Sequence, residues 1–407
     1  MRVLVTGAAG FIGSNVAKAL LERFEDATLV GIDNMDAYYD VSLKEKRLSG
    51  LLPNERFDFR KGDVSDKSFI DGVFAEFKPE YVLHFAAKVG VRHSVLHPED
   101  YINTNINGFF NILEACRSYP VTHLVYASSS SVYGASTMLP YTTDDRADYP
   151  LSLYAATKKS NEVMAHSYST LYGIPCTGLR FFTVYGPAGR PDMAYFGFTD
   201  RLVRGEKIQI FNHGNCRRDF TYIDDIVEGV IRVMKRPRRK GCGVFTDAPY
   251  ALYNIGNGHP ESLLDFVQIL QEELVAAGVL PKDHDFEAYK EFVPMQQGDM
   301  EETYADTTAF EWDFGFVPSV SLRDGLKAFA QWYAGCEDYR PSRSVECPDV
   351  AMADPLDESV AEVFDKILSG SSDGDVEVGA KVEVEFEAKV EVKLEAKVEM
   401  KVDVQKK

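Results

Sequence analysis

The 407-residue chain has no Cys-x-x-Cys pair and no apolar run near the roughly 20 residues of a membrane span. Its six cysteines are scattered, a spacing that favours free thiols in a reducing compartment over a disulfide framework or a metal site. We therefore expect no metal, no membrane association and a cytoplasmic location. The expected location also rests on the absence of a leader-like segment at the start of the sequence. The cysteines are Cys116, Cys176, Cys216, Cys242, Cys336 and Cys347.

Basic residues are outnumbered by acidic ones, and the formal net charge is −19. This balance argues against a nucleic-acid partner, because binding to the phosphate backbone depends on lysine and arginine. A small phosphorylated ligand remains compatible with it, since backbone amides and a few arginines can outweigh the global charge locally.

What the chain does contain is a regular alternation of apolar strand-like runs with helix-like stretches over its first half. The expected strands are 2–6, 28–33, 81–87, 123–129 and 176–182. The expected helices between them are 12–24, 67–77, 103–116 and 154–173. This order predicts an α/β fold, a Rossmann-type doubly wound parallel sheet with its ligand at the carboxyl ends of the strands.

The alternation loosens after about Tyr185, and we expect three regions. Residues 1–185 form a Rossmann domain to which later elements return, and 186–335 form mainly a smaller C-terminal substrate-binding lobe. Within this lobe the stretch 235–252 is expected to be a loop.

Residues 336–407 are predicted to be an acidic, repeat-containing tail. From Gly379 an eight-residue repeat places apolar residues at alternate positions, which is the period of a strand. The intervening charges favour a disordered or loosely structured extension. Strands that pair with one another, or a hook for a partner, are the alternatives.

A glycine-rich turn opens the sequence. In "VTGAAGFIGS", Gly7, Gly10 and Gly13 follow a strand and begin a helix, which suits close approach of a pyrophosphate to the backbone. Asp33 ends the next strand, 20 residues after Gly13, where a carboxylate binds ribose hydroxyls and repels a 2′-phosphate. The cofactor expected is therefore NAD rather than NADP. The alternative is a structural glycine turn capped by an aspartate.

Further residues are expected around the cofactor on the same strand ends. "GDVSD" (62–66) is expected to place Asp63 and Val64 beside the adenine, and "HFAAKVG" (84–90) is expected to line the end of the third strand. The remaining candidates are Phe11, Ile12, Asn34, Asp63, Val64, Phe85, Ala86, Ala87, Lys88, Asn105, Tyr154 and Lys158.

Tyr154 and Lys158 in "YAATK" are four residues apart on an expected helix and so share one face. A tyrosine is a poor base at neutral pH unless a nearby cation favours its phenolate. Such a pair is common by chance. Ser129, 25 residues before Tyr154 at the end of a strand, makes a catalytic arrangement the better interpretation.

Together, "TGAAGFIG", "HFAA", "SSSSVYG", "YAATK" and "LRFFTVYGP" resemble the extended short-chain dehydrogenase/reductase family over about residues 1–335. The resemblance is greatest to its nucleotide-sugar epimerases and dehydratases. It implies a tightly held NAD, a homodimer built through paired helices, and a Ser–Tyr–Lys triad. In that triad Tyr154 is the acid/base, Lys158 positions ribose and lowers the tyrosine pKa, and Ser129 bonds the reacting oxygen.

The serine row also bears on the reaction. Relatives that dehydrate or decarboxylate the sugar have a carboxylate just before "VYG", whereas this chain has Ser130 and Ser131. The resemblance therefore favours epimerisation at C4 by hydride transfer out and back. "FFTVYGPAGRPDMA" and the segment 31–48 resemble the UDP-glucuronate 4-epimerase subgroup, which implies conversion of UDP-glucuronate to UDP-galacturonate through a 4-keto intermediate.

Residues expected to bind the UDP-sugar come from several segments. Thr183, Arg190 and the serine row supply donors for a carboxylate, although Arg190 could instead form a surface ion pair and Thr183 could pack at a strand end. The segment 208–214 resembles the uracil-binding segment. By family position Arg218 contacts the diphosphate, and Asp299 matches a ribose-binding acid, although many relatives have arginine where Gln296 stands. The substrate-binding candidates are Ser128, Ser129, Ser130, Thr183, Arg190, Arg218 and Asp299.

Three alternatives stay open at this stage. Two are enzymatic, a UDP-glucose 4-epimerase and a UDP-glucuronate decarboxylase. The third is a non-catalytic NAD-binding scaffold or sensor, against which the joint presence of Ser129, Tyr154 and Lys158 weighs.

Overall fold

The computed structural model describes residues 1–241, 247–295 and 300–336. The acidic tail predicted from residue 336 onward therefore falls, except for Cys336 itself, outside the described residues. Asp299 and Gln296 fall outside them too.

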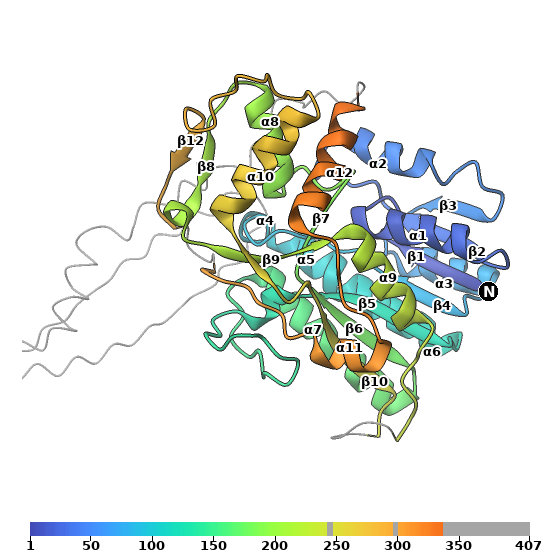
Figure 1. Cartoon of the computed structure of the whole chain (residues 1–407). Helices are drawn as coiled ribbons and strands as arrows, with labels where there is room; N and C mark the ends of the chain where they lie inside the picture. Colours follow the sequence, from blue (N-terminus) through green and yellow to red (C-terminus); the bar gives the residue numbers. More distant parts are fainter. Residues whose placement is uncertain (242–246, 296–299, 337–407) are drawn as a thin grey trace, which may run out of the picture. The chain divides into compact units, whose positions relative to one another are not determined.

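A seven-stranded sheet forms the centre of the fold, and all of its neighbouring strands run parallel (Figure 1). Its strands, in spatial order, are β10 (Tyr250–Ile255), β6 (Cys176–Phe181), β5 (His123–Ser129), β4 (Tyr81–His84), β1 (Arg2–Thr6), β2 (Thr28–Asp33) and β3 (Phe57–Lys61). The order reverses between β1 and β4, as in a doubly wound sheet. The predicted Rossmann-type architecture is confirmed.

The central strands form where apolar runs are continuous, because both faces of this sheet are covered. Val3, Leu4 and Val5 of β1 are fully buried. The strands expected at 81–87 and 176–182 end earlier, at His84 and Phe181. Two strands of this sheet, β3 and β10, were not predicted.

The missed strand β3 lies at one edge of the sheet and mixes charged with apolar residues, so no buried run marks it. The other, β10, begins within the stretch 235–252 that was expected to be a loop. That expectation is wrong from Tyr250 onward, where pairing with β6 supplies the register.

Helices cover both faces of the sheet (Figure 1). On one face α1 packs against α2 and α9, and α9 against α11; on the other, α6 lies between α3 and α7. The first group comprises α1 (Phe11–Arg23), α2 (Val41–Ser49), α9 (Ile223–Met234) and α11 (Thr308–Phe314). The second comprises α3 (Lys67–Phe77), α6 (Phe109–Ser118) and α7 (Leu153–Tyr172). Two short helices, α4 (His93–Leu96) and α5 (Pro98–Tyr101), and a π-helical turn, Ile102–Gly108, lead into α6.

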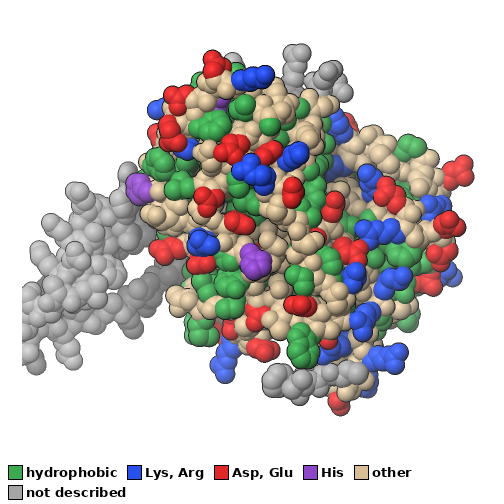
Figure 2. All heavy atoms as spheres, in the orientation of Figure 1, with side chains coloured by type: hydrophobic (Ala, Val, Ile, Leu, Met, Phe, Trp, Pro, Cys, Tyr) green, Lys and Arg blue, Asp and Glu red, His purple; other side chains and the backbone are tan. Residues whose placement is uncertain are grey.

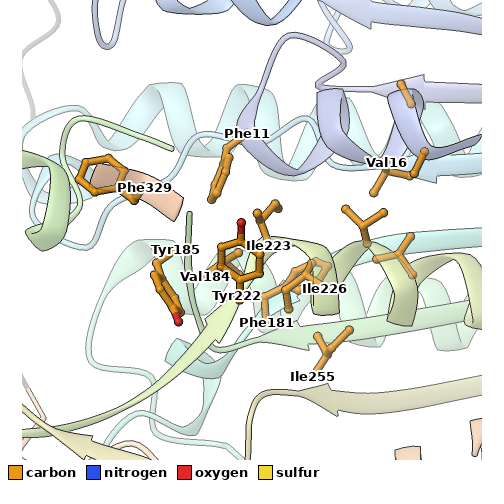
Figure 3. Close-up of a cluster of buried hydrophobic side chains, with 14 of the residues drawn as sticks. Phe11, Val16, Phe181, Val184, Tyr185, Tyr222, Ile223, Ile226, Ile255 and Phe329 are labelled. Carbon is orange, nitrogen blue, oxygen red and sulfur yellow. The ribbon is translucent and has the colours of Figure 1, made fainter. Parts of the chain in front are cut away.

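The core between α1, α9 and the sheet is continuous with apolar side chains from the second half of the chain. Figure 3 shows Val16 of α1 facing α9, with Ile226 and the strand residues Phe181 and Ile255 beneath. Phe329 belongs to the same cluster. Late elements are therefore anchored to the Rossmann core by burial of apolar surface.

The remaining elements are shorter. β7 and β9 pair in parallel and β11 pairs antiparallel with β9, while β8 pairs with β12. Two helices of this part, α10 and α12, pack on each other. The elements are β7 (Thr183–Tyr185), α8 (Ala194–Val203), β8 (Ile208–Ile210), β9 (Arg217–Tyr222), β11 (Pro260–Ser262), α10 (Leu263–Ala276), β12 (Lys290–Phe292) and α12 (Leu322–Ala334).

The surface charges, the helix lengths and the cysteines bear on the partners and the location expected from the sequence. Acidic and basic side chains alternate over the face drawn in Figure 2, without a basic patch. Among the helices that the structure describes, none is long and apolar enough to cross a membrane. The four cysteines within the described residues, Cys116, Cys176, Cys216 and Cys336, are buried free thiols.

Candidate active site

A cavity of about 390 Å³ opens at the carboxyl ends of the central strands. Its walls come from the turn after β1, the end of β2, the segment after β4, the end of β5 with the serine row, and the segment that joins β6 to β7. This is the edge at which a doubly wound sheet binds its ligand.

The glycine-rich turn forms one wall. Gly7 has a φ of +70°, and a Cβ there would lie 2.8 Å from the backbone nitrogen of Ala86. At Gly13 a Cβ would lie 2.2 Å from the carbonyl oxygen of Gly7. The missing side chains let the amino terminus of α1, which begins at Phe11, face the cavity with its free N–H groups. These features fit the pyrophosphate of a dinucleotide.

Asp33 ends β2 at this wall and is buried. Its carboxylate accepts hydrogen bonds from the backbone nitrogens of Ala9 (3.2 Å) and Met35 (2.8 Å). It also forms a buried ion pair with Lys44, whose Nζ lies 3.3 Å away. Lys44 lines the cavity and was not among the predicted site residues. Asp33 is thus held in place without using all of its acceptor capacity.

Asn34 lines the cavity, while Asp63 supports it from behind. The Asn34 side chain donates to Asp63 (2.7 Å), which also accepts from the backbone and hydroxyl of Ser65. Burial raises the pKa of the Asp63 carboxyl, but these hydrogen bonds outweigh it and leave the pKa below its ordinary value. Of the predicted pair Asp63 and Val64, only Val64 reaches the cavity wall.

The segment after β4 forms the floor beside the turn. Phe85, Ala86, Ala87 and Lys88 all line the cavity. Asn105 does not. Its side chain accepts from the Lys88 backbone nitrogen (2.8 Å) and donates to the Lys88 carbonyl (3.0 Å), so it holds the segment from behind.

All three residues of the predicted triad, Ser129, Tyr154 and Lys158, line the cavity. Burial raises the pKa of the Tyr154 phenol, while a hydrogen bond with Ser129 and the charge of Arg190 act in the opposite direction. Burial also lowers the pKa of Lys158 to about 7, and its Nζ donates to the Ala127 carbonyl (2.9 Å). Within the described residues, Ser129 and Arg190 thus act in favour of the phenolate, although the net pKa of Tyr154 stays above its ordinary value.

The four serines have different surroundings. The hydroxyl of Ser128 donates to Glu162 (2.6 Å), which forms a buried two-point ion pair with Arg180. Ser129 accepts from the backbone nitrogen of Ser131 (3.2 Å) and donates to its hydroxyl (3.2 Å). In this structure the Ser128 hydroxyl is thus engaged beneath the site.

All four serines contribute to the cavity wall. No carboxylate occupies the two positions before Val132.

On the opposite side, Thr183 and Arg190 line the cavity. Arg190 donates to both oxygens of Asp192 (3.0 and 2.7 Å), and the Tyr38 hydroxyl donates to the same carboxylate (3.3 Å). The ion pair anticipated for Arg190 exists; Arg190 lines the cavity, whereas its partner Asp192 is an exposed residue. Asp192 was not predicted.

The residues predicted to bind the nucleotide part of the substrate are not brought to the cavity in the same way. Arg218 is not part of the cavity wall; its Nη1 donates to the carbonyls of Arg217 (2.9 Å) and Glu301 (3.0 Å). Phe211, in the segment 208–214, lies 5.2 Å beneath the guanidinium of Arg92. Asp299 lies outside the described part of the chain.

This arrangement can exchange a proton with a sugar hydroxyl beside a dinucleotide, and Arg190, paired with Asp192 through Nε and Nη2, brings a guanidinium to the same cavity. Residues that sequence reasoning missed are Lys44, Glu162 and Asp192. Glu162 follows Lys158 by one helical turn, and Lys44 occupies the inner face of α2, so helical spacing was the available signal. In the described ranges no group of three or more His, Cys, Asp or Glu is placed to hold a metal ion.

Comparison with known proteins places these features in context. The sequence profile of the "NAD dependent epimerase/dehydratase family" matches residues 3–256. Protein CapI of Staphylococcus aureus is 47% identical over 341 residues, covering 82% of this chain and 98% of that protein. The probable UDP-glucuronate 4-epimerase of Rhizobium meliloti is 43% identical over 342 residues, covering 82% and 97%.

The fold is also similar to that of a solved enzyme. The crystal structure of UDP-glucuronic acid 4-epimerase from Bacillus cereus, in complex with UDP-glucuronic acid and NAD, superposes with a TM-score of 0.72. The two are 33% identical, and the alignment covers 82% of this chain and 98% of that one.

Proposed function

The chain belongs to the NAD dependent epimerase/dehydratase family, and on that premise we propose that it interconverts UDP-glucuronate and UDP-galacturonate by 4-epimerisation. The observation that carries the substrate assignment is that Arg190 lines the same cavity as Tyr154 and Ser129. A fixed guanidinium beside the acid/base suits a sugar whose C5 bears a carboxylate. The named function of the Rhizobium meliloti and Bacillus cereus proteins supports the same assignment.

NAD, when bound, supplies a hydride acceptor for C4 of the sugar and returns the hydride to it. We propose that Gly7, Gly10 and the amino terminus of α1 hold its pyrophosphate, and that Asp33 holds the adenosine ribose. Lys158, one helical turn after Tyr154 and lining the same cavity, would bind the nicotinamide ribose.

The proton moves through Tyr154. Its phenolate oxygen takes the proton of the sugar O4 as C4 is oxidised, and Ser129 donates a hydrogen bond to the same oxygen. The 4-ketose then turns over within the cavity. When the opposite face of C4 is reduced, Tyr154 returns the proton to O4, now in the inverted configuration.

The 4-keto intermediate of a glucuronate is a β-keto acid. It loses CO₂ when the bond from C5 to the carboxylate carbon lies perpendicular to the plane of the C4 carbonyl. We propose that Arg190 and Thr183 hold this carboxylate away from that orientation. The absence of a carboxylate at positions 130 and 131 removes the acid found in relatives that eliminate or decarboxylate.

We also propose the division of the chain into a cofactor domain, residues 1–185 joined by β10, and a nucleotide-sugar lobe, mainly residues 186–335. A cytoplasmic location is supported by the buried free thiols. A homodimer is supported by apolar side chains that α6 and α7 leave exposed: Phe110 (41%), Val163 (60%) and Leu171 (68%). Sedimentation analysis tests the dimer.

The function is tested by incubating the purified protein separately with UDP-glucuronate, UDP-glucose and UDP-xylose and resolving the products by NMR. The proposal predicts UDP-galacturonate from the first substrate and little turnover of the other two. Preferential conversion of UDP-glucose, or a pentose as the main product from UDP-glucuronate, would refute it in favour of the other two enzymatic alternatives. No conversion of any sugar with NAD still bound would indicate a scaffold.

A further inference from the structure

Arg47 of α2 is an arginine that is only 8% exposed and has no carboxylate partner among its hydrogen bonds. Its guanidinium instead donates to oxygens from three separate segments. Nε reaches the carbonyl of Ala188 (2.9 Å) and Nη2 that of Gly189 (2.8 Å). Nη1 reaches the carbonyl of Ala9 (3.1 Å) and the hydroxyl of Tyr39 (2.5 Å).

The first of these segments is held in an unfavourable conformation. Ala188 has a φ of +54°, in the left-handed region that disfavours a residue with a Cβ. At Gly189 a Cβ would lie 1.6 Å from the Tyr195 hydroxyl, so the backbone there passes directly over that side chain. A turn of this kind persists only where its surroundings fix it, and two donors of Arg47 bind its two carbonyls.

The next residue in the chain is Arg190, which lines the cavity beside Tyr154. By fixing the backbone at Ala188 and Gly189, Arg47 therefore also fixes the position from which the Arg190 side chain extends. The Ala9 carbonyl lies in the glycine-rich turn, and the Ala9 nitrogen donates to Asp33. One guanidinium thus joins the cofactor turn to the loop that carries Arg190.

We propose that Arg47 is a positioning residue for recognition of the substrate carboxylate, acting through the turn at Ala188 and Gly189 to place Arg190. This inference rests on the proposed function, because it requires Arg190 to bind a uronate carboxylate. Lysine cannot replace Arg47, since an ammonium lacks the planar fork that serves acceptors on several sides. A role confined to stabilising the fold is the competing explanation.

The carboxylate's share of binding is measured by comparing two ligands. UDP-xylose is UDP-glucuronate without the carboxylate, so the ratio of their dissociation constants reports that group alone. Titrations use the NAD-loaded protein with Tyr154→Phe in every variant, so that neither sugar is turned over. Arg47→Met is the test substitution, and Lys46→Met is its matched control, because Lys46 is an exposed neighbour on the same helix.

In the parent protein we expect UDP-glucuronate to bind at least about tenfold more tightly than UDP-xylose, as for a charge-assisted contact. Arg47→Met should reduce that ratio by about tenfold, with the UDP-xylose constant changed less than about threefold. Lys46→Met should leave both constants unchanged. Where Arg47→Met fails to fold by circular dichroism, Arg47→Lys is measured in the same way and should also lower the ratio.

Equal weakening of both ligands, or an unchanged ratio, overturns the positioning role and leaves a structural one. If the wild-type protein also converts UDP-glucuronate to UDP-galacturonate, the proposed function survives that result. A parent ratio near one overturns this inference and the proposed role of Arg190 together.

Discussion

The two sides of the cavity are held in place differently. On the cofactor side, the glycine turn, Asp33 and the segment after β4 are parts of consecutive βα units. On the substrate side, Thr183 begins β7, and Arg190 lies in the loop between β7 and α8. This loop is fixed by contacts from far along the chain, as when Arg47 bonds Ala188 across 141 residues.

We therefore expect the two sides to have different roles, NAD binding on the cofactor side and choice of reaction on the substrate side. The requirements of a ligand that does not change are met by glycines and by strand ends. A wall made of side chains on a loop can be altered residue by residue without disturbing the sheet. We therefore expect substitutions on the substrate side to change what is made, and those on the cofactor side to change how tightly NAD is held.

The largest effect is expected where the two sides meet, at Tyr154. Tyr154→Phe removes the only proton acceptor proposed for O4, and kcat should fall by about 10³- to 10⁴-fold. The amount of NAD retained on purification should stay the same, because the cavity shape is preserved. The measurement is turnover of UDP-glucuronate together with the NAD content of the denatured protein. A variant with a tenth of the wild-type kcat would show that another group is the base.

Lys158→Met should lower kcat by about 10²-fold and should also change how stability depends on pH. Burial lowers the pKa of Lys158 to about 7 from its ordinary 10.5. The unfolded chain therefore binds more protons than the folded one between these values, and this group makes the free energy of unfolding rise with pH across that window. The slope contributed is at most about 1.4 kcal/mol per pH unit.

Urea denaturation of the cofactor-free protein at pH 7.5, 8.5 and 9.5 checks this expectation. The free energy of unfolding of Lys158→Met should rise less with pH than that of the wild type. Parallel pH dependences would mean that Lys158 remains protonated in the folded protein.

A smaller effect is expected on the cofactor side alone. Asp33→Ser removes the carboxylate proposed to bind ribose and releases Lys44, which then attracts a 2′-phosphate. NAD should bind about 10- to 30-fold more weakly, and the ratio of the NADP dissociation constant to that of NAD should fall. Isothermal titration of both cofactors measures this. Asp33→Ser/Lys44→Met is the matched variant. If the ratio of the NADP to the NAD dissociation constant falls equally far in this variant, Lys44 is not the cause.

The smallest expected effect is a change of product on the substrate side. Thr183→Ala should release a few per cent of the product as a UDP-pentose, because one restraint on the carboxylate of the β-keto acid is lost. Chromatography of the nucleotide sugars detects it. If the pentose stays at the wild-type level, Thr183 does not restrain the carboxylate and packs at the end of β7 instead.

Much of the cofactor side could be predicted because its signals are local. Gly7, Gly13 and Asp33 lie within one βαβ unit, and their spacing alone places them at one strand edge. The sheet followed from continuous apolar runs, except for β3 and β10, whose pairing depends on neighbours rather than on their own composition.

The substrate side could be anticipated only in part. Arg190 and Thr183 were suggested by a motif, but their partners were not. Asp192 and Arg47 act through contacts that depend on how a loop turns, and no periodicity records that a guanidinium faces two carbonyls 141 and 142 residues away. Ser128 and Ser129 are neighbours in an identical run, yet the hydroxyl of Ser128 bonds Glu162 and that of Ser129 bonds Ser131.

The central claim is that hydride leaves C4 of a uronate and returns to the same carbon within one closed site. It is tested most directly by supplying UDP-glucuronate with deuterium at C4 and locating the label in the product by NMR. The account predicts UDP-galacturonate that keeps the deuterium at C4, with no loss to solvent. UDP-galacturonate with hydrogen at C4, or an unlabelled pentose, would contradict it.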